Sequence, residues 1–169
     1  MSVSLYEVSV PPLIHALSNL SSLIDKAAAH AEAKKIDPAV FVQARLYPDM
    51  LPFSRQVQIA CDNAKGGAAR LADVEVPKHE DSEKTLPELQ ARIAKTVEFL
   101  KSIDAQRMRD AERREIELKL TARTLRFTGL AYLNLYVLPN VYFHVSIAYA
   151  LLREGGVEVG KRDFLGPIQ

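Results

Sequence analysis

One stretch of the chain, from Phe127 to Leu152, contains no Asp, Glu, Lys or Arg. A helix of that length must either cross a bilayer or be covered over most of its surface by other parts of the protein. Polar and helix-breaking residues are spread along the stretch instead of being confined to its ends: Thr128, Asn134, Pro139, Asn140, His144, Ser146 and four tyrosines. Because polar groups inside a membrane are costly, the pattern favours a core helix of a soluble protein.

The rest of the composition limits the class of protein. A chain of 169 residues suits one domain over residues 1–169, large enough to bury a core without disulfides or a structural metal. The net charge of +1 gives no overall field that attracts nucleic acid or acidic lipid. A single cysteine, Cys61, excludes an internal disulfide, and the first residues lack a signal-peptide pattern. We expect a cytoplasmic protein that binds neither nucleic acid nor membrane.

Four segments repeat apolar residues every three or four positions, which is typical of amphipathic helices. The first covers residues 11–35, and Asp37-Pro38 opens a short helical turn after it. Asp49 is the expected N-cap of a second long helix, which ends before a polar loop at 73–84.

The third and fourth helices have clearer boundaries. Thr85 and Glu88 match the capping box that starts a helix, and this helix should end near residues 102–104. The fourth is expected over residues 128–154, where Gly155-Gly156 ends it, and Pro139 should kink or interrupt it. Four such helices with longer connections predict an all-α four-helix bundle.

The period changes between the third and fourth helices. Over residues 115–120 and again over 125–127, apolar residues alternate with charged ones. A period of two indicates β-strands, with residues 121–124 as the turn of a small hairpin. Because an isolated hairpin is marginally stable in water, this one should pack against the helices.

A polar pair on the fourth helix is the first candidate site. Asn140 and His144 are four residues apart and so share a face, together with apolar residues that should point inward. Buried polar groups need partners. A pocket, water, a metal ion or a ligand would satisfy this pair, and so would an ordinary hydrogen bond to a neighbouring helix.

The second helix carries the other candidates. Cys61 lies on its apolar stripe, where a free cysteine usually behaves as a small hydrophobic residue. If the helices bring Cys61 near His144, it becomes a possible nucleophile or metal ligand. Gln56, Gln58, Asp62 and Asn63 add polar groups to this helix, although they cannot all point inward. His15 should border the bundle interior, whereas His30 and His79 are expected at the surface.

The fourth helix also favours an oligomer. It carries Tyr132, Tyr136, Tyr142 and Tyr149, and tyrosine suits interfaces because it joins an apolar body to a polar tip. A small bundle cannot cover the whole of so apolar a helix, so we expect a homodimer. In a monomer the same tyrosines would lie at the edge of the core.

Several local strings resemble a known group of proteins. They are residues 48–52 (PDMLP), 55–60 (RQVQIA), 138–144 (LPNVYFH) and 160–164 (GKRDF). Together with a hairpin before a last helix that carries a polar i, i+4 pair, they resemble an uncharacterised branch of the DinB/YfiT-like superfamily of metal-dependent helical bundles. The resemblance to this branch covers nearly the whole chain.

The resemblance also implies what the site contains. In the superfamily, one histidine on the second helix and an HxxxH pair on the last helix bind a divalent metal. Here the last-helix pair reads Asn140-xxx-His144, and the second-helix position falls at Cys61 or, in another register, at Gln58. The resemblance therefore implies a degenerate site with no metal. The alternative is a divalent metal at Cys61, Asn140 and His144.

Two functions follow as expectations. The first is an uncharacterised cytosolic DinB-like dimer that keeps a small-molecule pocket lined by Asn140, His144, Cys61 and Gln58. The second rests on the resemblance, because some superfamily members are thiol-dependent transferases or isomerases. In that case His144 would be the general base, Asn140 would orient the substrate, and Cys61 would line the pocket or act as nucleophile.

Overall fold

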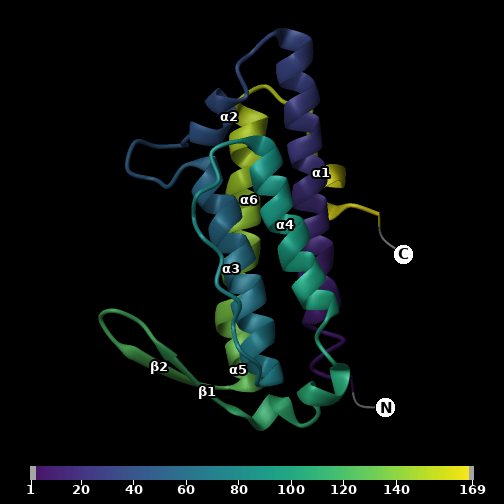
Figure 1. The fold of residues 1–169 in the computed structure, drawn as a ribbon, viewed down its shortest axis with the longest axis vertical. Helices are drawn as coiled ribbons and strands as arrows, with labels where there is room; N and C mark the ends of the chain where they lie inside the picture. The colour runs from purple at the N-terminus through teal and green to yellow at the C-terminus, as the bar shows by residue number, and fades with distance from the viewer. Residues whose placement is uncertain (1–2, 168–169) are drawn as a thin grey trace.

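The computed structural model describes residues 3–167 and is built around four long helices that run side by side (Figure 1). They are α1 (Val10–Lys34), α3 (Phe53–Ala72), α4 (Leu86–Lys101) and α6 (Leu138–Glu154). Shorter helices are α2 (Ala39–Gln43), α5 (Gly129–Tyr132) and α7 (Lys161–Leu165), and two 3₁₀ turns cover Ala105–Met108 and Ala111–Arg113. The predicted four-helix bundle is confirmed.

The core lies where the apolar stripes of the four helices meet. The stripe of α1 is buried from Leu13 to Ala31, and that of α3 is buried from Phe53 to Ala72. Helix α3 packs against both α4 and α6, and α1 packs against the same two helices from the other side. Burial of these stripes is the main contribution to stability, because each fully buried large aliphatic side chain contributes about 1.5–3 kcal/mol.

The start of α3 differs from the prediction. Asp49 is exposed and does not cap the helix, which begins at Phe53 with Pro52 as its N-cap residue. The physical reason is the Leu51-Pro52 step. A proline ring disfavours helical backbone angles at the residue before it, so a helix cannot run through Leu51.

The capping box before α4 is confirmed. The Thr85 hydroxyl accepts a hydrogen bond from the Glu88 N–H at 3.3 Å, and the Glu88 carboxylate accepts one from the Thr85 N–H at 3.0 Å. Two of the unpaired N–H groups at this end of the helix are thereby satisfied.

The predicted interruption at Pro139 is also confirmed, and it takes the form of a π-helix. Residues Leu133–Val137 form a π-helical segment between α5 and α6, and Pro139 is the second residue of α6. Proline has no N–H, and its ring clashes with the carbonyl four residues earlier. The wider π turn removes that conflict and rotates α6 relative to α5.

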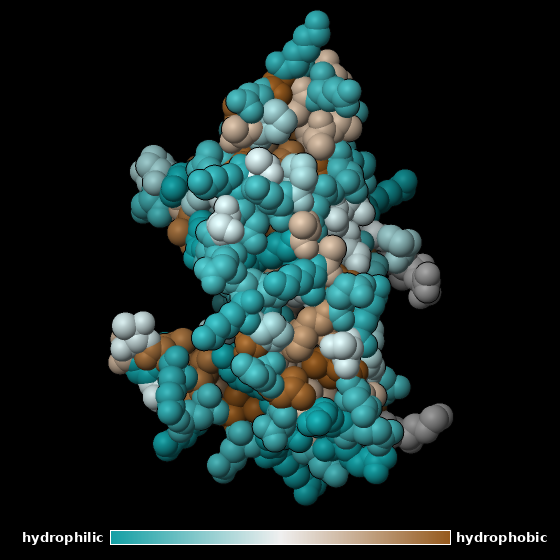
Figure 2. Space-filling model, in the orientation of Figure 1, coloured by the Kyte–Doolittle hydropathy of each residue, from teal (hydrophilic) through white to brown (hydrophobic). Residues whose placement is uncertain are grey.

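The hairpin consists of β1 (Glu115–Lys119) and β2 (Thr124–Thr128), paired antiparallel with Glu115 opposite Thr128. Ile116 and Leu118 are buried on one face, as the alternation predicted. The hairpin extends away from the bundle near α5 (Figure 1). Figure 2 shows a mainly hydrophilic face over α3 and α4, with hydrophobic residues gathered around the hairpin.

Candidate functional site

The candidate site centres on a hydrogen bond between α6 and α3. His144 Nδ1 lies 2.7 Å from Oε1 of Gln56, whose side chain is almost completely buried. His144 itself is half-buried, as expected for a residue at the border of the inward face of α6. The structure therefore joins the last helix to the second long helix through His144, but the partner is Gln56.

The surroundings of Gln56 fix the protonation pattern of the histidine. Gln56 Nε2 donates to the carbonyl oxygen of Leu51 at 2.9 Å, so Oε1 is the acceptor that faces His144. His144 Nδ1 must then carry the proton, which leaves Nε2 with a lone pair in the neutral ring. Burial lowers the pKa of His144, because desolvation disfavours the imidazolium form.

The second ring nitrogen is open to a ligand. Among residues 3–167, His144 Nε2 has no hydrogen-bond partner and is not one of the buried unpaired nitrogen atoms. Asn140 lies one turn earlier on the same side of α6, and its Nδ2 donates to the Tyr136 carbonyl at 2.7 Å. The two residues thus border one strip of surface, and His144 Nε2 supplies a base there.

Cys61 does not join this pair. It lies five residues after Gln56, which is about 140° around the helix, and therefore faces a different neighbour. Its thiol is completely buried beside Thr96 and Arg92 on α4. Burial raises the pKa of Cys61 to about 12, outweighing the opposing influence of Thr96 and of the charge of Arg92.

This environment predicts an inert thiol. We expect no reaction of native Cys61 with Ellman's reagent over minutes at pH 8, and full reaction after denaturation, because a buried thiol with a raised pKa is neither ionised nor accessible. The measurement is absorbance at 412 nm with and without denaturant. A native protein that reacts as fast as the unfolded chain would contradict the buried assignment.

Gln58, the other residue considered for the second-helix position, faces the loop between α3 and α4. Its Nε2 donates to Glu83 at 2.8 Å, and its Oε1 accepts from Arg55 at 2.7 Å. It belongs to an ionic cluster centred on Arg92, whose side chain is only 1% exposed.

His79 in the same loop was expected at the surface, and it is only partly exposed there. Both of its ring nitrogens are buried without a hydrogen-bond partner among residues 3–167, because the loop folds back over α3 and α4. Burial, followed by the nearby charge of Lys65, lowers the pKa of His79. A polar loop sequence does not reveal such packing, because the ionic contacts that hold the loop come from other segments.

Comparison with known proteins places this arrangement in a family. The family model described as a domain of unknown function (DUF1993) matches residues 5–165. The chain belongs to the DUF1993 family. No curated protein matches the sequence. A crystal structure of a DinB family member protein from Shewanella denitrificans is 41% identical to this DUF1993 chain, covers 97% of it and 93% of its own length, and superposes with a TM-score of 0.89.

The DinB-like fold of this DUF1993 protein implies a metal site, but the residues present do not fit one. Cys61 faces Thr96, the Asn140 amide is bonded within its own helix, and His144 Nδ1 is bonded to Gln56. Within residues 3–167, no group of three His, Cys, Asp or Glu side chains converges closely enough to hold an ion. The set Cys61, Asn140 and His144 is therefore not a metal site in this arrangement.

Sequence reasoning identified Asn140 and His144 but not the role of Gln56. Gln56, Gln58 and Cys61 all lie within two turns of α3, and each faces a different neighbour. The one local signal is that Gln56 follows the start of the helix by three residues, which lets its amide reach the Leu51 carbonyl. The ligand-binding roles of Asn140, His144, Cys61 and Gln58 remain predictions.

Proposed function

We propose that this protein is a cytosolic homodimer that binds a small protic molecule beside His144 without a metal ion. The observation that carries the proposal is the 2.7 Å hydrogen bond from His144 Nδ1 to Gln56, which leaves Nε2 as an acceptor. A neutral histidine held in one tautomer accepts a proton or hydrogen bond from an O–H, N–H or S–H group. Asn140 lies within one helical turn and supplies a second polar contact.

The first test reads the histidine directly. In ¹H–¹⁵N spectra of the imidazole nitrogens, His144 should be the Nδ1–H tautomer and titrate below the ordinary histidine value of about 6.5. Gln56→Leu should remove the tautomer preference, because the acceptor is lost. A His144 ring in the Nε2–H tautomer in the wild-type protein would contradict the proposed base.

The class of ligand is tested with matched pairs of small compounds. In the methyl ether of a phenol, and in the methyl thioether of a thiol, a methyl group replaces the acidic proton. We expect only the protic member of each pair to shift the His144 signals, and His144→Ala to abolish that binding. His30→Ala is the matched control and should leave it unchanged. Equal binding of ethers and protic compounds would reject the proposal.

The dimer is supported by the outer surface of the last helix. The segment Gly129–Glu154 meets the length and hydropathy expected of a membrane-spanning helix, a test that core helices also meet. Leu130, Leu135 and Phe143 on its outer side are 47%, 73% and 55% exposed. The rings of Phe143 and His144 also pack edge to face, with their centroids 5.2 Å apart. This apolar surface therefore borders the candidate site.

We infer that a second copy of the chain covers this surface. The hairpin extends beside it with Leu120 exposed near its turn, and Figure 2 shows an indentation between the hairpin and the body of the bundle. In a two-fold dimer the hairpin of each copy would lie against the apolar surface of the other. Such a contact is isologous, because both copies use the same hairpin and the same surface.

Sedimentation velocity tests the dimer. We expect twice the chain mass for the wild type and the chain mass for the double variant Leu135→Asp/Phe143→Asp, because a buried unpaired charge opposes association. Val40→Asp is the control: Val40 is 60% exposed on α2, away from this surface, and its variant should stay dimeric. A concentration-independent monomer, or wild-type protein that floats with lipid vesicles, would reject the dimer.

A further inference from the structure

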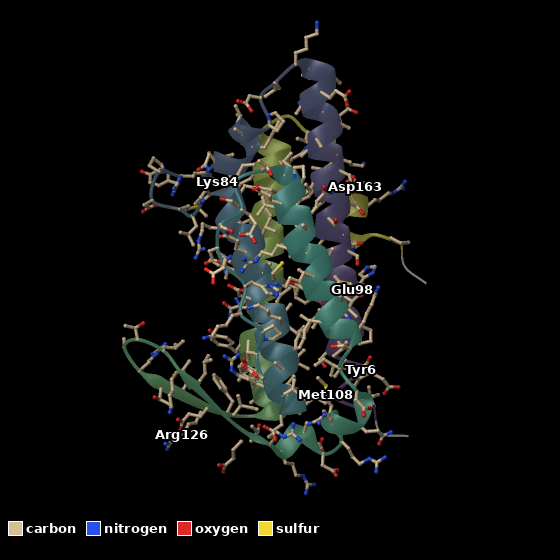
Figure 3. All side chains as sticks on the ribbon, in the orientation of Figure 1. Tyr6, Lys84, Glu98, Met108, Arg126 and Asp163 are labelled. Carbon is tan, nitrogen blue, oxygen red and sulfur yellow. The ribbon has the colours of Figure 1, made fainter. Side chains whose placement is uncertain are left out.

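A pocket of about 590 Å³ lies between α1, α6 and α7, on the opposite border of α6 from His144. The C-terminal helix α7 forms one wall because three contacts hold it to α1. Lys26 pairs with Asp163 at 2.7 Å, Asn19 Nδ2 donates to the Phe164 carbonyl at 3.1 Å, and His15 Nε2 contacts the Leu165 carbonyl at 2.6 Å. Figure 3 shows Asp163 against α1.

Apolar groups make up most of the lining. Pro11 and Pro12 contribute from the first turn of α1, Val145 from α6 and Leu165 from α7. Two aromatic rings, Tyr142 and Phe164, face the pocket from α6 and α7. Pockets of this size with mainly apolar walls and a few polar groups are the usual form of small-molecule sites.

The charge of the lining selects among ligands. Among the described residues 3–167, Glu7 is the only Asp, Glu, Lys or Arg that lines the pocket. Hydrogen bonds from the backbone N–H and then the hydroxyl of Ser4, at 2.8 and 2.9 Å, hold its Oε2 and lower the pKa of Glu7. The carboxylate is therefore ionised at neutral pH and kept in one orientation, so it attracts a cation and repels an anion.

The aromatic rings favour the same choice. The faces of tyrosine and phenylalanine attract a cation, most strongly where water is partly excluded. Phe164 packs edge to face against Tyr149, with ring centroids 6.0 Å apart, so its ring lies between α7 and α6. We propose that the pocket between α1, α6 and α7 binds a small molecule with an apolar body and a cationic nitrogen, with the nitrogen facing Glu7.

Three probes that share a phenylethyl body test this proposal: 2-phenylethylamine, 2-phenylethanol and 3-phenylpropanoate. Each is titrated into the full-length protein while backbone ¹H–¹⁵N signals are recorded. We expect the amine to bind most tightly and the carboxylate most weakly, with shifts at residues 13–19, 142–145 and 164–165. For a largely exposed carboxylate, the gain of amine over alcohol should be about threefold.

Substitutions distinguish the effect of the Glu7 charge from the effect of the shape of the pocket. Glu7→Gln should reduce amine affinity to that of the alcohol and leave alcohol binding unchanged. Glu32→Gln, which removes an exposed carboxylate near the C-terminal end of α1, should have no effect. Tyr142→Ala, at a side chain that is 41% exposed, should weaken the amine more than the alcohol. Thermal unfolding of each variant confirms that it is folded.

Four results would overturn the proposal. They are binding of the carboxylate as tight as that of the amine, equal effects of Glu7→Gln and Glu32→Gln, shifts confined to other surfaces, and no binding of any probe at concentrations on the order of 10 mM. None of these outcomes depends on His144, so they are distinct from a failure of the proposed function.

Discussion

Replacing Arg92 by alanine should lower the free energy of unfolding by about 3 kcal/mol. Arg92 Nη2 lies 2.8 Å from Asp62 and 3.0 Å from Asp81, and Nη1 lies 3.0 Å from Glu83. Nη1 also donates to the Glu80 carbonyl at 2.9 Å, so one buried guanidinium joins α3, α4 and the loop between them. Its removal would leave neighbouring carboxylates without their shared counter-charge.

Urea denaturation measures this effect, and hydrogen exchange locates it. Amides of residues 78–84 should exchange faster in Arg92→Ala, because the loop loses its anchor. Arg109→Ala is the control: Arg109 is exposed and bonds only to Gln106 among the described side chains, so its loss should cost less than about 0.5 kcal/mol. Equal effects of the two substitutions would show that the Arg92 cluster does not stabilise the fold.

The same cluster sets the response to acid. Burial raises the pKa of Glu83, but hydrogen bonds from its own backbone N–H, Gln58 and Arg92 outweigh burial and lower it overall. At Asp81, the hydrogen bonds and charges of Arg55 and Arg92 outweigh burial in the same way. Their stabilisation is therefore complete above the ordinary carboxyl pKa values and is lost as the pH falls through the lowered folded values. Arg92→Ala should lose less stability on acidification than the wild type.

Gly67→Ala should destabilise the protein by about 2 kcal/mol, although alanine is the better helix former. A Cβ at Gly67 would lie 2.5 Å from Cγ1 and 2.8 Å from Cγ2 of Val137, which is completely buried at the end of the π-helical segment. Both atoms sit close to the backbone of a packed helix, so they cannot move away without shifting α6 against α3.

The adjacent glycine is the matched control. A Cβ at Gly66 would meet the flexible end of Arg70, which can move, so Gly66→Ala should be neutral or slightly stabilising. Adding Val137→Ala to Gly67→Ala should restore more than about 1 kcal/mol relative to the sum of the single effects. Urea denaturation gives all four values. Additive effects would contradict a direct contact between Gly67 and Val137.

Local patterns in the sequence determined most of the architecture. The apolar stripes place four helices, because a period of 3.6 residues exposes one face of each to its neighbours. The alternation over residues 115–120 locates β1, and the capping box at Thr85 starts α4. The incorrect prediction that Asp49 caps α3 also concerns a local feature, because Pro52 disfavours helical backbone angles at Leu51.

Only the tertiary structure decided which polar groups meet. Successive side chains along α3 point in directions that differ by about 100°. If α3 were rotated about its axis or shifted along it relative to α6, His144 would face a residue other than Gln56. Rotation and offset are set by how side chains of distant segments fit together, such as Gly67 against Val137. The helices can therefore be predicted from short windows, whereas the site depends on contacts between residues far apart in the chain.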